Sequence, residues 1–356
     1  MTPRENLLRS LRRQGFDSVP LDPSGFCPSQ VEAFKQRFGH DDIEGWFGAP
    51  CRDLELPLTA TYTDTKALYP RERLPADIGF DAFGIGHSRQ PDCYHMTRMH
   101  HPLAGDAPLA EIEHHPFPVP ARSAAAVAQL ARDADGIRAR GLAVMGGMAC
   151  TVWETAWYLR GMEDLMGDMM DDSPRAIVLL DRVTALACEQ IRILAQAGCD
   201  LVKLGDDIGM QSTPMMNPAL WRRWLKPRLA QVIAAGRAVK PDLLIFYHSC
   251  GYVLPFIEEL IEIGVDILNP VQPECMAFAE VHAKFGDRLS FWSTIGTQTT
   301  LPFGTPAEVK AVVEKNLRIC GAKGGIVIGP THLVEPEVPW ANLVALKEAC
   351  AQFRLL

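Results

Sequence analysis

From about residue 141 onward, the chain alternates between short apolar runs and longer stretches with helical periodicity. Most of the short runs are apolar at successive positions, which is typical of parallel strands covered by helices. They span residues 142–145, 201–204, 243–247, 265–268, 289–292 and 326–328. Between them the pattern predicts helices over 174–197, 218–239, 252–263, 306–319 and 340–353. The alternation therefore predicts a series of βα units.

Proline and glycine mark the ends of several predicted helices. Pro174, Pro218 and Pro306 stand at helix starts, where the missing N–H of proline costs nothing. Gly198 and Gly264 stand at helix ends, where glycine readily adopts a left-handed conformation. These signals support the helix boundaries that the apolar pattern suggests.

Six βα units in the last two-thirds of the chain leave room for two more upstream, and eight units close a barrel. We therefore expect one α/β domain over residues 1–356, a single TIM-type (β/α)8 barrel with a helical and irregular N-terminal extension over residues 1–75. The first two strands are not placed by the pattern, although residues 80–85 form one candidate. A doubly wound sheet is the rival architecture, but it normally brings a glycine-rich phosphate loop, and Gly84 and Gly86 lack the third glycine.

Composition narrows the function classes. A hydrophobic content of 47% in 356 residues supports a large core, and a net charge of -8 gives no basic field to attract nucleic acid. No apolar stretch reaches the roughly 20 residues of a membrane helix, so we expect a cytoplasmic protein. The 10 cysteines are scattered and are expected to be mostly buried thiols. Whether the chain is a monomer or a homodimer stays open.

The most specific chemistry follows the apolar run 243–247. His248 and Cys250 come two residues apart, and residues i and i+2 of a strand point to the same side. An imidazole beside a thiolate suits zinc. A packed histidine and an ordinary free cysteine are the alternative explanation of this pair.

A second histidine, His332, follows the last apolar run. Because a barrel gathers the carboxyl ends of its strands at one mouth, His248, Cys250 and His332 form a hypothetical three-ligand zinc site with an open fourth position, as in catalytic zinc centres. The third ligand stays open between His332 and another group. Cys275 lies on a loop at the same end, whereas Cys320 should point to the opposite end.

Other polar residues at the same mouth are candidates for catalysis or substrate binding. We assign a catalytic role to Asp206 and Gln272, and a substrate-binding role to the following group, all of which are polar and near predicted strand ends or loops: His87, Glu154, Asp207 and Thr294. Helix capping is the competing explanation for the aspartates, and the start of a helix for Glu154. The histidine-rich segment with His87, His95, His100 and His101 is a weaker candidate for a metal cluster.

Three strings carry a resemblance to a known family. They are YHSCG at 247–251, IGVDILNPVQ at 263–272 and LPFGTP at 301–306. With them, the chain resembles the uroporphyrinogen decarboxylase superfamily over nearly its whole length, and more closely its methyltransferase branch, which includes methylcobalamin:coenzyme M methyltransferases and corrinoid-dependent O-demethylase components. The resemblance implies a single TIM-type barrel.

The resemblance also implies a function. Members of the methyltransferase branch bind zinc through a His-x-Cys pair and a distant cysteine, and His332 stands here in place of that cysteine. The implied activity is a zinc-dependent transfer of a methyl group between a small methyl ether or thiol and cobalamin or another corrinoid carried by a separate protein. A decarboxylase of a tetrapyrrole or polyacid is the second possibility, but the chain lacks the arginine-rich N-terminal segment of true uroporphyrinogen decarboxylases. A barrel that only binds a small ligand is the third. The sequence does not identify the methyl donor or acceptor.

Overall fold

Seven parallel strands form the central sheet of the computed structural model, which describes residues 1–90 and 97–354. The sheet order follows the chain, and the strands are β1 (Cys51–Leu54), β7 (Ala143–Ala149), β8 (Leu201–Gly205), β9 (Leu244–His248), β10 (Ile267–Asn269), β11 (Ser290–Trp292) and β12 (Ile326–Val327). Beyond β12, Leu21 adds an isolated parallel bridge to Ile328. The sheet is curled, and the architecture is α/β and consistent with the expected TIM-type barrel.

The six apolar runs of the sequence correspond to β7 through β12. Upstream, however, residues 80–85 do not supply a barrel strand. Gly79–Phe80 (β3), Gly86–Ser88 (β4) and Arg98–His100 (β5) form a separate antiparallel sheet, with the extended turn of 81–85 between the first two. The first strand of the barrel is β1 instead, so the stretch 1–75 contributes to the barrel sheet as well as to the extension. With only four residues, two of them charged, β1 has too little apolar pattern to be recognised.

Helices connect successive strands and cover the outside of the sheet. From residue 124 onward the helices are α5 (Ala124–Ala139), α6 (Trp153–Arg160), α7 (Met162–Met170), α8 (Pro174–Gln196), α9 (Pro218–Trp224), α10 (Lys226–Arg237), α11 (Ile257–Glu262), α12 (Phe278–Phe285), α13 (Thr300–Phe303), α14 (Pro306–Cys320) and α15 (Trp340–Gln352). Pro174, Pro218 and Pro306 do begin helices. In the described part of the chain, no helix combines the length and apolar character that a membrane span requires.

The amino-terminal end of the barrel is closed by α1 (Pro3–Leu11). Its Leu7, Leu8 and Leu11 pack against the inward-facing residues of the strands, among them Phe246 and Trp292. Arg4 forms a salt bridge with Asp200 at 2.6 Å, which fixes α1 beneath β8. Access to the barrel interior is therefore from the carboxyl ends of the strands.

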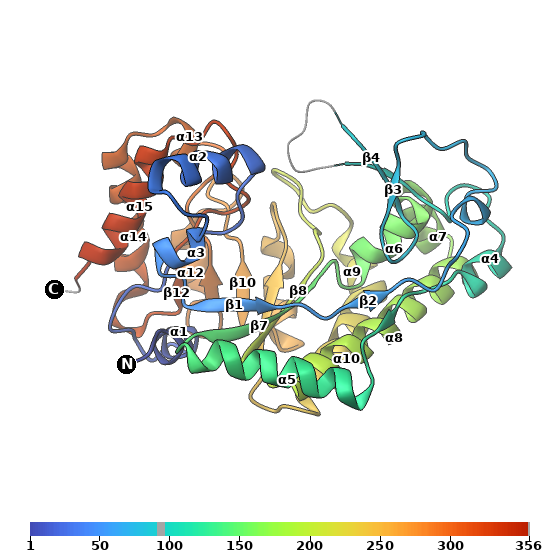
Figure 1. Ribbon diagram of the computed structural model, residues 1–356, viewed down its shortest axis with the longest axis horizontal. Helices are drawn as coiled ribbons and strands as arrows, with labels where there is room; N and C mark the ends of the chain where they lie inside the picture. The colour runs from blue at the N-terminus through green and yellow to red at the C-terminus, as the bar shows by residue number, and fades with distance from the viewer. Residues whose placement is uncertain (91–96, 355–356) are drawn as a thin grey trace.

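The rest of the N-terminal half surrounds this frame. Two further helices, α2 (Pro28–Phe38) and α3 (Ile43–Phe47), lie near the C-terminal helices, and an excursion formed by residues 55–90 and 97–122 lies at the opposite side of the barrel (Figure 1). Besides β3, β4 and β5, the excursion contains β2 (Leu58–Thr59), β6 (Val119–Pro120) and α4 (Leu109–His114). Its loops reach the carboxyl end of β7, where Leu56 and Phe83 line a cavity of about 280 Å³ together with Cys150 and Tyr158.

Candidate functional site

His248 is the last residue of β9 and faces the barrel interior. Its orientation follows from strand alternation, because Phe246 and Leu244, two and four residues earlier, belong to the interior cluster. Two residues further on, the Sγ of Cys250 lies 3.6 Å from the Nε2 of His248. Ser249, between them, is fully buried and points elsewhere, since its hydroxyl accepts a hydrogen bond from the N–H of Ile208 at 3.0 Å. The i, i+2 spacing therefore does bring the imidazole and the thiol together.

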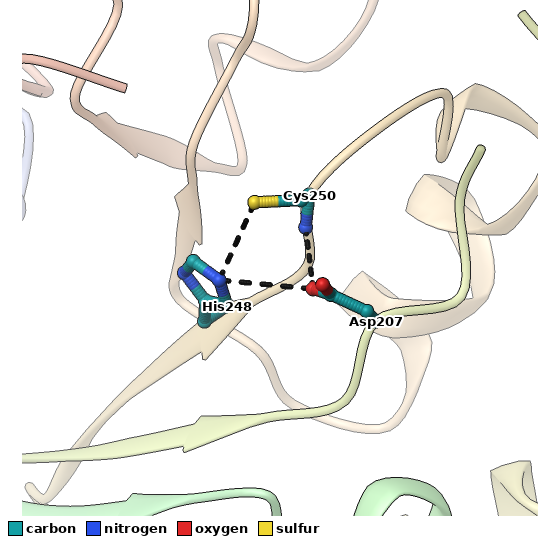
Figure 2. Close-up of side chains that lie close together, drawn as sticks. All are labelled: Asp207, His248 and Cys250. Atoms are coloured by element: carbon teal, nitrogen blue, oxygen red, sulfur yellow. Dashed lines mark hydrogen bonds and ion pairs between the residues drawn. The ribbon is translucent and has the colours of Figure 1, made fainter. Parts of the chain in front are cut away.

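A carboxylate joins this pair from the neighbouring strand. Asp207 follows β8, and its Oδ1 lies 3.7 Å from the Nε2 of His248 and accepts the N–H of Cys250 at 2.8 Å (Figure 2). The three candidate ligand atoms all lie within 4.8 Å of one another. Imidazole nitrogen, thiolate sulphur and carboxylate oxygen are the three usual protein ligands of zinc. We call Asp207, His248 and Cys250 the mouth cluster.

Asn269 fixes the orientation of the His248 ring. Its Oδ1 lies 2.6 Å from the Nδ1 of His248, and its Nδ2 donates to the carbonyl oxygen of Trp292 at 3.0 Å. Because the amide oxygen can only accept, the proton of the neutral imidazole resides on Nδ1. The lone pair of Nε2 therefore points at the mouth cluster, which is how histidine ligands of metals are normally prepared.

Burial shifts the pKa values of two members of the mouth cluster. It raises the pKa of the Cys250 thiol far above its ordinary value, and the charges of Asp207 and Glu154 act in the same direction. Burial also lowers the pKa of His248, against the opposing charge of Asp207. The lowered pKa favours the neutral imidazole, which is the form that binds a metal. A cation bound beside Cys250 would stabilise the thiolate form of its side chain.

Two further acids lie next to the cluster. Asp206 is 3% exposed, and its carboxylate accepts the N–H groups of Val152 and Glu154 at 3.0 Å and 2.9 Å, which holds the start of α6 against β8. Burial raises the pKa of Asp206 to about 7. Glu154 accepts the hydroxyl of Tyr158 at 2.9 Å, and burial, followed by the charges of Asp207 and Asp206, raises the pKa of Glu154 to about 8. Asp206 therefore caps the start of α6, and Glu154 lies close enough to Asp207 of the mouth cluster for that charge to raise its pKa.

His332 is not part of the mouth cluster in the described structure. The chain turns away after β12, where the N–H of Thr331 donates to Ile295 O at 2.9 Å. His332 instead lines a hollow of about 360 Å³ with Gln272 and Glu335. The sequence could not distinguish a histidine near the mouth from one whose loop directs it to this neighbouring hollow.

Gln272 and Thr294 also take positions different from those expected of reacting groups. The Oε1 of Gln272 accepts the N–H of Gly251 at 2.5 Å, so this side chain supports the loop that carries Cys250. Thr294 is 1% exposed and accepts a hydrogen bond from Asn316 on α14 at 3.0 Å, which places it outside the sheet.

The histidine-rich segment does not form a metal cluster in the described part of the chain. His87, on β4, contacts Thr97 at 2.8 Å and Asp81 at 3.3 Å. The Nδ1 of His100 lies 2.7 Å from Glu72, and that of His101 lies 2.8 Å from Tyr158 O. His95 lies outside the described residues.

Sequence reasoning missed three residues of the site. Asn269 stands in the string 263–272 that carries the family resemblance, but the sequence does not show that it lies in register with His248 on the neighbouring strand. Lys203 and Asp53 both occupy inward-facing strand positions. The available signal was a charge inside a short apolar run, since Lys203 interrupts 201–204.

Fold and site together define an α/β barrel whose mouth carries three side chains that could hold a metal ion. Residues 110–353 match the family model described as "Uroporphyrinogen decarboxylase (URO-D)", and the chain belongs to this family. Members of the superfamily are enzymes, either decarboxylases or methyltransferases.

Two comparisons with individual proteins concern the sequence and the fold. Uroporphyrinogen decarboxylases of Coxiella burnetii, strains Dugway 5J108-111 and RSA 493, are 23% identical over 177 residues, which is 50% of this chain and 47% of theirs. The chain thus spans about half the length of the curated relatives it matches. Among solved structures, a methyltransferase from Methanosarcina mazei superposes with a TM-score of 0.65 at 19% identity and covers 98% of both chains. The last comparison supports the fold over the whole chain.

Proposed function

We propose that this protein is a zinc-dependent methyltransferase that moves a methyl group between a small methyl ether or thiol and a corrinoid carried by a partner protein. The observation that carries the proposal is the mouth cluster, in which three ligand atoms of different chemistry lie within 4.8 Å of one another. A decarboxylation that needs no metal gives no reason for this convergence. The family membership, which includes both reaction types, is compatible with the proposal.

The donor set fits zinc. Cys250 supplies a sulphur, His248 supplies Nε2 with its lone pair directed by Asn269, and Asp207 supplies an oxygen from the adjacent strand. Three protein ligands leave the fourth position of a tetrahedral site to the substrate. Zinc bound there would supply Lewis acidity, which lowers the pKa of a thiol or makes an ether oxygen a better leaving group.

The remaining roles belong to the chain itself. Asn269 holds the imidazole, and Gln272 supports the backbone of Gly251 beside Cys250. The pKa of Glu154, raised to about 8 by burial and by neighbouring carboxylates, lets its carboxyl group hold a proton near neutral pH at the edge of the cluster. The closed amino-terminal end and the accessible carboxyl end leave the mouth as the side from which the corrinoid partner would approach.

Metal analysis of the purified protein tests the proposal. We expect about one zinc per chain, lost in His248→Ala and in Cys250→Ala. The second measurement mixes the zinc-loaded protein with a Co(I) corrinoid carrier and methoxylated aromatics or methylated thiols, and follows the absorbance of methyl-Co(III). Metal-free protein with an intact fold would contradict the proposal.

A decarboxylase is the second candidate, because the matched family model and the curated relatives carry that description. This candidate predicts that the protein releases CO2 from a polycarboxylate and that this activity persists after zinc is removed with a chelator. The two candidates are thus separated by the same chelation experiment, in which the methyltransferase loses its activity.

A further inference from the structure

A serine, a histidine and a glutamate form a chain of hydrogen bonds at the small antiparallel sheet of β3, β4 and β5. The Oγ of Ser88 on β4 lies 3.0 Å from the Nε2 of His100 on β5. The other ring nitrogen of His100, Nδ1, lies 2.7 Å from the Oε1 of Glu72. We call Ser88, His100 and Glu72 the serine triad. This sheet is separate from the seven strands of the barrel (Figure 1), so the proposed methyl transfer at the mouth cluster gives no reason for the arrangement.

The register of the small sheet brings the serine and the histidine together. Gly86 pairs with His100 and Ser88 pairs with Arg98, so Ser88 and His100 are diagonal neighbours on one face of the sheet. A Cβ added to Gly86 would lie 3.1 Å from the Cβ of His100, and glycine at this position therefore avoids crowding the histidine. The hydroxyl of Tyr69 accepts the N–H of Gly86 and lies 2.8 Å from the carbonyl oxygen of His100, which holds the two strands in this register.

The hydrogen bonds also determine which nitrogen of His100 can act as a base. Because the carboxylate of Glu72 can only accept, the proton of the neutral imidazole lies on Nδ1, and Nε2 accepts a hydrogen bond from the hydroxyl of Ser88. Ser88 and His100 are only 7% and 4% exposed, which keeps bulk water away from this hydrogen bond. A nucleophile, a base within hydrogen-bond distance and a third group that orients the base are the arrangement that activates serine for covalent catalysis.

A positive charge stands beside the serine. Arg98 is paired with Ser88 across the ladder, so both side chains leave the same face of the sheet, with their Cβ atoms about 5 Å apart. Arg98 is exposed, whereas Ser88 is buried. A guanidinium in this position can stabilise the oxyanion that forms when a serine attacks a carbonyl carbon.

We infer that Ser88, His100 and Glu72 form a second catalytic site, which hydrolyses small carboxylic esters without a metal. The Oγ of Ser88 forms a bond to the ester carbonyl carbon while the Nε2 of His100 takes the hydroxyl proton. The C–O bond to the alcohol then breaks, and His100 gives this proton to the departing alcohol. Water attacks the acyl-serine by the same route, which releases the carboxylic acid and restores the serine. The ester must be small, because Ser88 is largely buried.

Covalent labelling of the native protein tests this site directly. An activated serine displaces fluoride from a fluorophosphonate and keeps the phosphoryl group on its Oγ, and peptide mass spectrometry identifies the labelled residue. We expect about one label per chain, on Ser88, in metal-free and in zinc-loaded protein. A label on other residues only, or no label at all, would overturn the inference. This measurement needs no variant, so it stands even if Ser88→Ala does not fold.

Hydrolysis of p-nitrophenyl acetate by chelator-treated protein measures the activity itself, since a metal at the mouth cluster then makes no contribution. Ser88→Ala should abolish turnover, and His100→Gln should slow acylation by about 100- to 10,000-fold. Glu72→Gln should slow it by at least about 10-fold, because the imidazole loses the group that orients it. Ser29→Ala, at an exposed position on α2, is the matched control and should hydrolyse the ester like the native protein. Turnover that survives Ser88→Ala would contradict the inference, whereas loss of the zinc-dependent function would not affect it.

Discussion

The Oδ1 of Asn269 lies 2.6 Å from the Nδ1 of His248, and this contact joins two adjacent strands of the barrel at its mouth. It fixes both the rotation of the imidazole ring and the nitrogen that carries the proton. The same amide is anchored at its other end by the carbonyl oxygen of Trp292. The fold therefore orients the His248 imidazole so that its Nε2 can bind a metal ion.

Removing this contact should weaken zinc binding without removing a ligand. In Asn269→Ala the ring of His248 is free to rotate and to change tautomer, and we expect zinc affinity to fall by about 10- to 100-fold. Competition with a chromophoric chelator measures the change. Gln36→Ala, at an exposed position on α2, is the control and should bind zinc like the native protein. Unchanged affinity in Asn269→Ala would show that the contact does not orient a ligand.

The third ligand can be identified by a pair of variants. Asp207→Ala should reduce zinc affinity by at least about 10-fold, because it removes a ligand from the mouth cluster. His332→Ala should change the affinity by less than about 3-fold, because its side chain lines the hollow beside Gln272.

Asp207→Asn separates binding of the metal from support of the loop. The asparagine can still accept the N–H of Cys250, which Asp207 accepts at 2.8 Å, but it no longer carries the negative charge. We expect weakened zinc binding with near-native stability in this variant. A large loss of zinc in His332→Ala together with none in Asp207→Ala would instead restore His332 as the third ligand.

A pH dependence of stability is expected from Glu259 on α11. Hydrogen bonds from Arg222, the larger cause, and from Lys226 lower the pKa of Glu259 from 4.5 to about 2. A carboxyl whose folded pKa is depressed stabilises the fold above its unfolded pKa, and this contribution is lost as the pH falls from 4.5 toward 2. Solvent screens the partners, so Glu259→Gln should cost only about 1 kcal/mol near neutral pH.

Urea unfolding of the native protein and Glu259→Gln at neutral pH and near pH 3 measures this difference. The gap between the two proteins should shrink in acid and in high salt. Glu113→Gln, an exposed change on α4, should show no such trend. A gap that grows on acidification would contradict the assigned direction of the pKa shift.

Most of the barrel could be predicted from apolar periodicity because β7 through β12 are buried runs separated by long helices. The pattern failed at β1, which is short and partly charged, and at residues 80–85, of which only Phe80 belongs to a strand, β3 of a small antiparallel sheet. Local hydrophobicity reports burial but does not report which partner strand provides it. The first strand of the barrel was therefore accessible only through long-range pairing with β7.

The site, like the fold, could be predicted only in part from the sequence. His248 and Cys250 could be predicted as neighbours because two residues on one strand share a side, and the structure places their Nε2 and Sγ atoms 3.6 Å apart. Asp207 was noticed but assigned to substrate, since its closeness to the pair depends on the register between β8 and β9. The position of His332 depends on a loop conformation for which the sequence has no periodic signal.

Two glycines of the barrel interior provide the last prediction. Gly205 faces His248 across the register of β8 and β9, and a Cβ added to Gly205 would lie 2.7 Å from the His248 Cβ and 2.9 Å from its carbonyl oxygen. Neither atom belongs to the far end of a flexible side chain, so β9 itself must shift. We expect Gly205→Ala to cost about 1–3 kcal/mol of stability and to weaken zinc binding, because the shift moves His248 away from Asp207.

Gly147→Ala is the matched control, since a Cβ at Gly147 meets nothing within 4 Å. It should leave zinc affinity unchanged and should alter stability by less than about 1 kcal/mol, in the stabilising direction, through the lower entropy of the unfolded chain. Thermal unfolding and zinc competition on both variants measure the two effects. If Gly205→Ala behaved like Gly147→Ala, the close approach of β8 to His248 would not be what positions the metal ligand.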